Sequence, residues 1–224
     1  VWSDFGVRGE GITVASIDSG VRFEHPALIG QYRGNRGGAI NHNYNWFDVY
    51  GDSPTPVDSG NHGTHTMGTM VAAGGSPAQP AVGVAPGANW MAVRACSARE
   101  CSEVDLMLAA QWLLAPTDLN GENPRPDLRP HVINNSWTAG QNATWYAGYT
   151  AAWRAAGIYP IFAAGNTGNQ NGCGTVQSPG DYADVTAVGA LDSSDRLTSF
   201  SSIGPGPGGR LKPDLTAPGS GVWS

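Results

Sequence analysis

The sequence predicts an α/β fold built on a mostly parallel β-sheet with helices on both faces. Short apolar runs alternate along the chain with segments whose apolar residues recur at helical spacing, and strands separated by helices pair in parallel. The composition fits a folded domain, because 40% of the 224 residues are hydrophobic and only 13% are charged. Since the sequence shows no internal repeat and no linker, we expect one domain over residues 1–224.

Five apolar runs predict the strands of this sheet. The first is a buried strand over residues 12–17, which ends at Asp18 with Ser19-Gly20 as the turn. The other four predicted strands cover residues 88–95, 131–136, 158–164 and 185–190.

Three segments predict helices. One begins at His62, where methionine and valine side chains recur at helical spacing among small residues. A second follows Ser102, a predicted N-cap with an acidic residue three positions on, and runs to residue 115. The third covers residues 143–156. Residues from about 30 to 60 are rich in Gly, Asn and Pro, which predicts a long irregular segment.

The charge and composition of the chain argue against some classes of function and favour others. The net charge is −6 and no basic run occurs, so we expect no nucleic-acid partner, which would need clustered Lys and Arg. No apolar stretch approaches the ~18–20 residues of a membrane span. Few lysines and 32 glycines fit a secreted enzyme with short polar loops, so we expect an extracellular protein. Val1 begins nearly inside the domain, and we expect any targeting or pro-segment to have been removed or omitted.

The three cysteines are an odd count. Cys96 and Cys101 bracket a short polar loop, so they could close a small disulfide in an oxidising compartment or remain isolated thiols. Cys173 has no evident partner in the sequence. Because no CxxC pair occurs, we expect no zinc site and assign no metal ligands.

The strongest chemical signal is Asp18-Ser19-Gly20 followed by Asn61-His62-Gly63-Thr64-His65. Asp18 ends an apolar run, where a carboxylate is costly unless it has a fixed partner. An imidazolium is the obvious partner, because the acid orients the ring, fixes its tautomer and stabilises its positive form. Asp18 and His62 therefore look like the first two members of a Ser-His-Asp triad, in the order acid then base.

Several polar residues follow predicted strands and should meet at one edge of the sheet. Asp18, Ser136 and Gly165-Asn166 all lie at carboxyl ends of strands, where the sites of parallel sheets gather. We expect a carboxylate oxygen of Asp18 within ~2.6–3.2 Å of a ring nitrogen of His62. Asn166 should face the same cleft, and His65 should point away into the helix packing.

Five ordered motifs resemble the subtilisin-like serine proteases, the subtilase family. They cover nearly the whole chain and comprise Val14–Gly20, His62–His65, Val132–Ser136, Ala163–Asn166 and Leu211–Gly219. The resemblance implies a subtilisin-like three-layer α/β fold and a serine endopeptidase acting on protein or peptide substrates. It also implies a secreted monomer, with its own pro-segment as a further partner.

The resemblance implies a role for each matching residue. Asp18 becomes the triad acid, His62 the general base and Asn166 the oxyanion-hole amide, with His65 a structural neighbour. A strand that pairs with the substrate backbone is matched by Asn135, Ser136, Trp137 and Thr138. Further substrate-binding positions are Ala163, Ala164, Gly165 and Gln177, the last near the floor of the primary specificity pocket. The Ser178-Pro179 bond of that loop should be cis.

The sequence also departs from the family pattern. A Gly-Thr-Ser-Met-Ala nucleophile motif should follow Ala217-Pro218-Gly219, but the chain reaches Ser224 without it. We therefore expect a chain truncated before the nucleophile serine, which carries only the acid and base and lacks the C-terminal part of the fold. Calcium is compatible with the resemblance as a structural ion, although residues 74–82 lack the Asn-rich and Asp-rich pattern of a tight site. No other cofactor is expected.

Three other functions remain open. A second triplet, Asp58-Ser59-Gly60, allows an aspartic protease, although the two copies are too close for two lobes and the helices contradict an all-β fold. His62 and His65 could share a metal ion, although no acidic third ligand is evident. If the chain is naturally complete, a catalytically inactive pseudo-protease or binding module becomes the leading interpretation.

Overall fold

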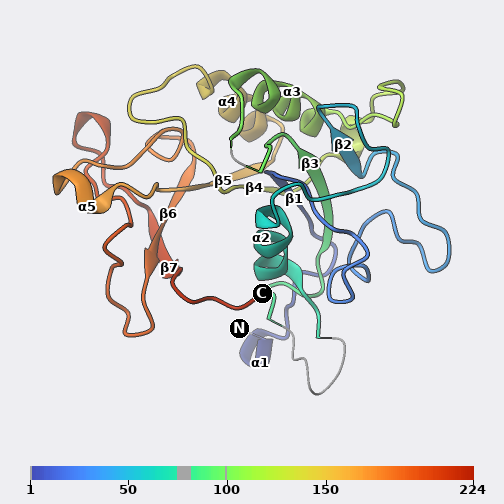
Figure 1. The fold of residues 1–224 in the computed structure, drawn as a ribbon, viewed down its shortest axis with the longest axis horizontal. Helices are drawn as coiled ribbons and strands as arrows, with labels where there is room; N and C mark the ends of the chain where they lie inside the picture. Colours follow the sequence, from blue (N-terminus) through green and yellow to red (C-terminus); the bar gives the residue numbers. More distant parts are fainter. Residues whose placement is uncertain (1, 75–81, 99) are drawn as a thin grey trace. The chain divides into compact units, whose positions relative to one another are not determined.

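The computed structural model describes residues 2–74, 82–98 and 100–224, which fall into two packing units. The N-terminal unit comprises residues 1–133 together with 223–224, and the C-terminal unit comprises residues 134–222. Figure 1 colours the two along the sequence, from blue and green to yellow and red. The expectation of a single domain over residues 1–224 stays a prediction.

The sheet of the N-terminal unit is built around β3. Strand β3 (Asn89–Arg94) pairs in parallel with β1 (Thr13–Asp18) on one side and β2 (Trp46–Asp48) on the other. Every residue of β1 is buried, as expected for a continuous apolar run in a parallel sheet covered on both faces. The register places Asp18 beside Arg94, so both strands end at the same edge.

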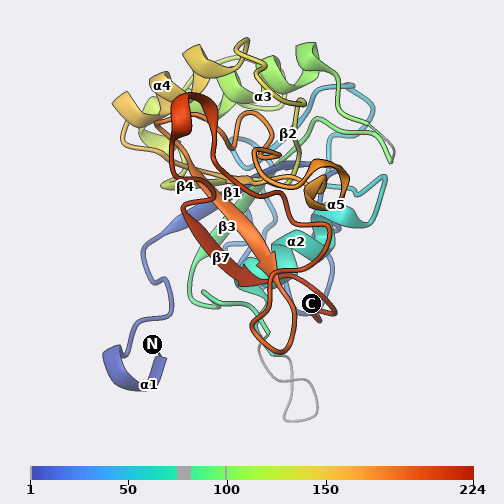
Figure 2. The same cartoon turned by 90° about the vertical axis from the view of Figure 1, so that its left-hand side faces the viewer.

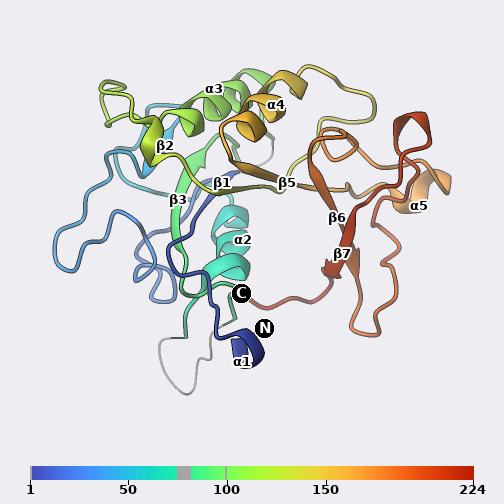
Figure 3. The same ribbon diagram turned by 180° about the vertical axis from the view of Figure 1, so that it is seen from behind.

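Helices cover both faces of this sheet. Helix α2 (His62–Val71) lies on one face and α3 (Glu103–Leu114) on the other, as Figures 1 and 3 show. Met67 and Val71 of α2 pack with Val14 and Trp90 of the strands in one apolar core. The predicted cap of α3 is confirmed, because Ser102 Oγ accepts a 3.1 Å hydrogen bond from the Asp105 N–H. Two short helices complete the unit, α1 (Trp2–Phe5) and η1 (Pro126–Leu128).

The C-terminal unit has its own parallel strands. Strand β6 (Thr186–Leu191) lies between β5 (Tyr159–Ala163) and β7 (Leu215–Pro218), and Figure 2 shows β7 facing the viewer. Strand β4 (Val132–Asn135) contains the boundary between the units. Helix α4 (Ala147–Ala155) packs on β5, and two short helices follow, α5 (Gly168–Asn171) and η2 (Pro207–Gly209).

An aromatic cluster joins α4 to its strand. The ring of Tyr146 lies 5.6 Å from that of Trp153 and 5.0 Å from that of Trp137, which in turn contacts Phe162 of β5 at 5.3 Å. These edge-to-face contacts fill the space that a helix-on-sheet layer must close.

The parallel strands and the helices packed on them confirm the predicted α/β class. None of the described helices is long and apolar enough to cross a membrane.

Three elements differ from expectation. The helix predicted over residues 143–156 begins only at Ala147, because Asn142 adopts a left-handed φ of 58° and the Tyr182 hydroxyl takes the carbonyl of Ala143. Strand β2 lies in the segment predicted to be irregular, and β7 has no predicted counterpart. The residues of these two strands do not predict them, because β2 has only three residues and all four residues of β7 are exposed. Both strands form by pairing with a neighbouring strand.

Candidate active site

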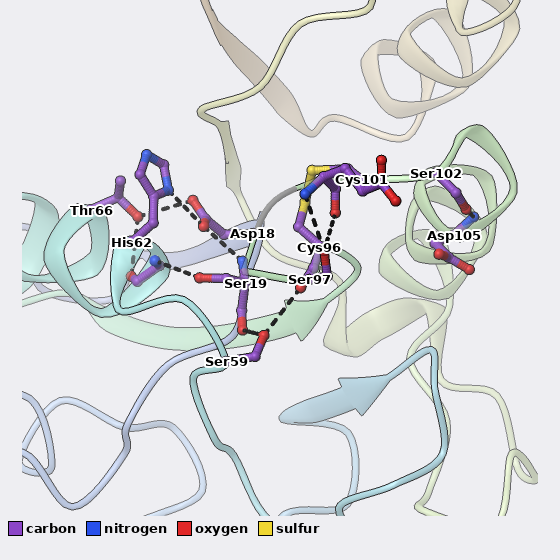
Figure 4. Close-up of a disulfide and its surroundings, with 12 residues drawn as sticks. Asp18, Ser19, Ser59, His62, Thr66, Cys96, Ser97, Cys101, Ser102 and Asp105 are labelled. Atoms are coloured by element: carbon purple, nitrogen blue, oxygen red, sulfur yellow. Dashed lines mark hydrogen bonds and ion pairs between the residues drawn. A yellow bond between two sulfur atoms is a disulfide. The ribbon is translucent and has the colours of Figure 1, made fainter.

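Asp18 is a buried carboxylate at the carboxyl end of β1, with a hydrogen bond from each of three directions (Figure 4). It is 4% exposed, and its Oδ1 accepts hydrogen bonds from the Ser19 N–H at 2.7 Å and from His62 Nδ1 at 2.8 Å. Its Oδ2 accepts a longer bond of 3.3 Å from Thr66 Oγ1, one turn along α2. A buried carboxylate is stable only with such partners, so the strand end and α2 fix Asp18 together.

His62 is the first residue of α2 and presents its ring to solvent. Its side chain is 57% exposed, although Nδ1 is committed to Asp18. Because a carboxylate can only accept, Nδ1 carries the proton, and Nε2 of the neutral ring is left as the acceptor. The hydrogen bond to Asp18 raises the pKa of His62 above its ordinary 6.5, against the opposing effect of partial burial, and the charges of Asp18 and Asp58 add to the rise.

The start of α2 is capped by residues outside the helix. Asn61, the N-cap, has a left-handed φ of 61° and makes no side-chain cap bond. The Gly63 N–H donates to Ser19 Oγ at 3.0 Å, and the Thr64 N–H donates to Asp58 Oδ2 at 2.8 Å. These two acceptors satisfy donors that the first turn of a helix leaves free, so they set where the helix begins and where His62 lies.

Two glycines allow the segments around Asp18 to approach closely. Gly20 has a φ of 101°, and a Cβ there would lie 1.9 Å from the carbonyl oxygen of Val57. A Cβ on Gly63 would lie 2.0 Å from the carbonyl oxygen of Gly20. Only glycine fits either position, which explains why the aspartate triplet ends in glycine and why glycine follows His62.

His65 takes no part in the contact with Asp18, as predicted, but its expected surroundings were wrong. The side chain is exposed instead of packed, because the buried face of α2 is formed by residues 63, 67, 68 and 71. Its carbonyl oxygen accepts a 2.6 Å hydrogen bond from Ser224 Oγ.

The open question about the cysteines is resolved in favour of a disulfide between Cys96 and Cys101. It closes the turn after β3 next to the Asp18 loop, as Figure 4 shows. The Cys96 N–H donates to the carbonyl oxygen of Asp18 at 3.1 Å, and Ser59 Oγ donates to the carbonyl oxygen of Cys96 at 3.4 Å. Cys173 is exposed and has a free thiol.

The geometry disfavours the aspartic-protease alternative. The two Asp-Ser-Gly triplets do lie together, since Gly20 and Asp58 form an antiparallel bridge. Their carboxylates, however, have separate donors. Asp18 accepts from His62, and Asp58 accepts from Ser19 and Thr64, whereas an aspartic dyad shares one proton between two carboxylates.

A metal site gains no support from the side chains that can be placed. Across residues 2–74, 82–98 and 100–224, no group of three or more His, Cys, Asp or Glu side chains could hold an ion. His62 and His65 therefore lack the third ligand that the metal alternative requires. Most of the 74–82 segment considered for calcium, residues 75–81, lies outside the described residues.

In the C-terminal unit, four predicted substrate-binding residues lie together. Thr138 Oγ1 donates to Gln177 Oε1 at 3.1 Å, and a Cβ on Gly165 would lie 2.6 Å from that same oxygen. The Gln177 N–H donates to the carbonyl oxygen of Ala164 at 2.9 Å. The predicted cis bond between Ser178 and Pro179 is present. Ala163 is the last residue of β5.

The other residues predicted for substrate contact have varied surroundings. Asn166 is exposed just after β5, within the C-terminal unit. Asn135 is buried and its Nδ2 donates to the carbonyl oxygen of Ile161, while Ser136 Oγ accepts from Asn134 Nδ2. Trp137 belongs to the aromatic cluster and is 8% exposed. The roles of these residues, and a shared cleft for Asn166 and the Asp18–His62 pair, stay predictions.

Sequence reasoning missed the supporting partners of the pair. Thr66, Ser19 and Asp58 were not assigned to the site, although Ser19 and Asp58 belong to the two Asp-Ser-Gly triplets and Thr66 directly follows the histidine motif. The sequence does indicate a place for Thr66 near the pair, because it is four positions after His62 and so lies on the same helix face.

The chain belongs to the subtilase family. Residues 9–224 match the family of peptidases S8, described as the Subtilase family. The chain is 42% identical to bacillopeptidase F of Bacillus subtilis (strain 168) over 226 aligned residues, and 30% identical to serine protease AprX of the same strain. These matches cover 98% and 97% of this chain, but only 16% and 48% of the relatives. The chain thus spans less than half the length of these two proteins.

A solved structure agrees with the fold. The crystal structure of a cold adapted subtilisin-like serine proteinase matches with a TM-score of 0.70 and 25% sequence identity. The match covers 96% of this chain and 66% of that one. Both the family and the subtilisin-like fold predicted from the sequence motifs are confirmed.

Proposed function

We propose that the full-length protein is a serine endopeptidase that hydrolyses peptide bonds with an Asp-His-Ser triad. Asp18 is the acid and His62 the general base, and a segment outside residues 1–224 supplies the nucleophilic serine. One observation carries the proposal: His62 Nδ1 lies 2.8 Å from Asp18 Oδ1 in a chain of the subtilase family. This is the acid–base half of the triad arrangement.

The pair supports a definite proton path. With its Nδ1 proton held by Asp18, the neutral ring of His62 takes the serine proton at Nε2 as the hydroxyl attacks the scissile carbonyl. The imidazolium then gives that proton to the leaving amine. Asp18 stabilises the positive ring throughout and is not itself protonated.

The raised pKa of His62 suits this role. A general base works best when its pKa lies near the working pH, because it is then both unprotonated and strongly basic. The exposed ring of His62 also leaves Nε2 accessible to a substrate and a nucleophile.

The remaining roles come from the family and are part of the same proposal. The Asn166 amide donates to the developing oxyanion, an interaction whose loss costs about 10²–10³ in kcat. The backbone of residues 135–138 pairs with the substrate chain, and Gln177 lies near the floor of the primary specificity pocket, beside Ala163, Ala164 and Gly165. Protein and peptide substrates follow from this β-strand mode of recognition.

We also propose that the protein is a secreted monomer, with its own pro-segment as a partner. The Cys96–Cys101 disulfide supports an oxidising location, since such bonds persist mainly outside the reducing cytosol. Detection of the mature protein in the extracellular fraction would test the location, and sedimentation of the purified protein would test its oligomeric state.

Covalent labelling tests the activity directly. The full-length protein should react with a serine-directed phosphonate and hydrolyse a peptide ester, and the His62→Ala variant should lose both reactions. His65→Ala is the matched control, because it removes a histidine of the same helix that does not contact Asp18. Unchanged labelling of His62→Ala would contradict the assigned base. A wild-type protein that is folded but never labelled would favour a pseudo-protease or binding module.

A further inference from the structure

Asp58 has no role in the proposed triad, yet its carboxylate is linked through Ser19 to Asp18 and to the residue after His62. We propose that Asp58, acting through Ser19 and the first turn of α2, is a positioning residue that holds His62 against Asp18. The proposal rests on the proposed function, because it concerns the base of that same reaction.

The carboxylate of Asp58 collects four hydrogen bonds. Its Oδ1 accepts from Ser19 Oγ at 2.7 Å and from the Gly60 N–H at 2.9 Å. Its Oδ2 accepts two hydrogen bonds from Thr64, one from the N–H at 2.8 Å and one from Oγ1 at 2.5 Å. A half-buried carboxylate with four donors has its position fixed, and here the donors come from the end of β1, its own loop and α2.

Ser19 connects this carboxylate to the catalytic pair. Its hydroxyl donates to Asp58 and accepts from the N–H of Gly63, the residue directly after His62. Its own N–H donates to Asp18 Oδ1 at 2.7 Å. One serine therefore holds the acid through its backbone and the backbone beside the base through its side chain.

The loop carrying Asp58 is itself attached to the end of β1. Gly20 and Asp58 form an antiparallel bridge, and the Ser59 N–H donates to the carbonyl oxygen of Ser19 at 3.0 Å. The left-handed Gly20 lets the two backbones come this close. The orientation of α2 relative to β1 is thus set at Asp58, and a small shift there would move His62 relative to Asp18. Displacements of about 1 Å at a catalytic group can cost about 100-fold in rate.

The negative charge of Asp58 has a second effect, on the protonation of His62. Burial opposes ionisation of Asp58, but the hydrogen bonds from Thr64 and Ser19 outweigh it and hold its pKa below the ordinary value, so the group is negative at neutral pH. A negative charge is favourable at the N-terminus of a helix. Among the described residues of the N-terminal unit, Asp18 and Asp58 are the charged groups that act on His62, and both favour its protonated form.

The alternative is a purely structural role, in which Asp58 only caps α2 and stabilises the fold. Kinetic constants measured per active site distinguish a positioning role from this structural role. In the full-length protein, Asp58→Asn keeps the shape but removes the charge and two acceptor sites. We expect kcat per phosphonate-titrated site to fall about 10- to 100-fold with KM changed less than about twofold. The acid limb of the kcat/KM profile should also move to lower pH, since the pKa of His62 falls. Asp127→Asn, a matched change at an exposed carboxylate paired with Arg125, should leave both quantities unchanged.

Ser19 variants separate geometry from charge. Ser19→Ala removes the connecting hydroxyl but keeps both carboxylates, so kcat should fall while the acid limb stays close to its wild-type position. Ser19→Thr restores a hydroxyl and should recover most of the rate. Asp58→Asn with wild-type kcat and pH profile per titrated site would overturn the proposal. So would a variant whose only change is a lower melting temperature.

A measurement without turnover keeps this test distinct from that of the proposed function. The pKa of the His62 ring can be followed by NMR titration of the full-length protein. We expect a lower pKa in Asp58→Asn than in the wild type, whether or not the phosphonate reacts. An equal pKa in both proteins would contradict the charge effect, whereas an inactive wild type with a shifted pKa would contradict only the proposed function.

Discussion

The ring nitrogen Nδ1 of His62 lies 2.8 Å from Oδ1 of Asp18, although 44 positions separate the two residues along the chain. A strand brings Asp18 to the edge of the sheet, and a helix that begins at His62 brings the ring to the same edge. The contact makes the protonation of His62 dependent on Asp18, and the first prediction follows from that dependence.

The acid limb of the pH–activity profile should lie above pH 6.5. His62 must be neutral to accept a proton, and its raised pKa means that activity is lost as the pH falls through a value above 6.5. Asp18→Asn should move this limb to lower pH and reduce kcat by about 10⁴-fold. Rates of peptide-ester hydrolysis between about pH 5 and 9 would measure both effects. An acid limb at or below 6.5 in the wild type would argue against the pair.

The same pKa has an opposite consequence for stability. A histidine whose pKa is raised on folding stabilises the folded state most below its unfolded pKa, and this contribution disappears as the pH rises through the folded value. The urea midpoint of the wild type, compared with that of His62→Gln, should therefore show its larger advantage on the acid side. A constant difference across the pH range would mean that the pKa is not raised.

Gly63→Ala should disrupt the site. The added Cβ would lie 2.0 Å from the carbonyl oxygen of Gly20 and 3.1 Å from Cβ of Asp18, so α2 must move away from β1. We expect the free energy of unfolding to fall by about 1–3 kcal/mol, together with a loss of activity. Gly148→Ala in α4 is the control, because its Cβ would meet nothing within 4 Å, and it should be neutral or stabilising by up to about 1 kcal/mol. Equal effects of the two substitutions would contradict the close approach.

Loss of the disulfide should lower stability moderately. Cys96 and Cys101 are five positions apart, and a loop of this size predicts about 2 kcal/mol from the restricted unfolded chain. Cys101→Ser should therefore lower the melting temperature of the full-length protein, and dithiothreitol should do the same to the wild type. Cys173→Ser should have no effect, since that thiol is exposed and unbonded. A melting temperature indifferent to dithiothreitol would mean that the bond does not form in solution.

A polypeptide of residues 1–224 should show no turnover above background. It contains the proposed acid and base but no Gly-Thr-Ser motif, and loss of the nucleophile from a triad costs on the order of 10⁶ in kcat. Hydrolysis of a peptide ester by this polypeptide would be compared with that by the full-length protein. Clear proteolysis by residues 1–224 would contradict the triad assignment.

The sequence by itself determined the α/β class, the strands β1, β3, β4, β5 and β6, and the starting points of α2 and α3. Each depends on a local pattern: an apolar run such as that of β1, or a cap such as Ser102. Strands β2 and β7 could not be predicted in this way, because hydrogen bonds from β3 and β6 create them and their own residues carry no pattern. The start of α4 escaped prediction for a similar reason, since the distant Tyr182 hydroxyl takes a carbonyl that would otherwise serve the helix.

The candidate active site shows the same division between what the sequence predicted and what only the tertiary structure decided. The order of the aspartate and histidine motifs was enough to predict the contact between Asp18 and His62. Only the tertiary structure decided which residues hold that contact, because Ser19, Asp58 and Thr66 act through hydrogen bonds between separate segments. Those bonds require two backbones to meet at Gly20 and Gly63, an approach that depends on how β1, the Asp58 loop and α2 pack together and that no local pattern encodes.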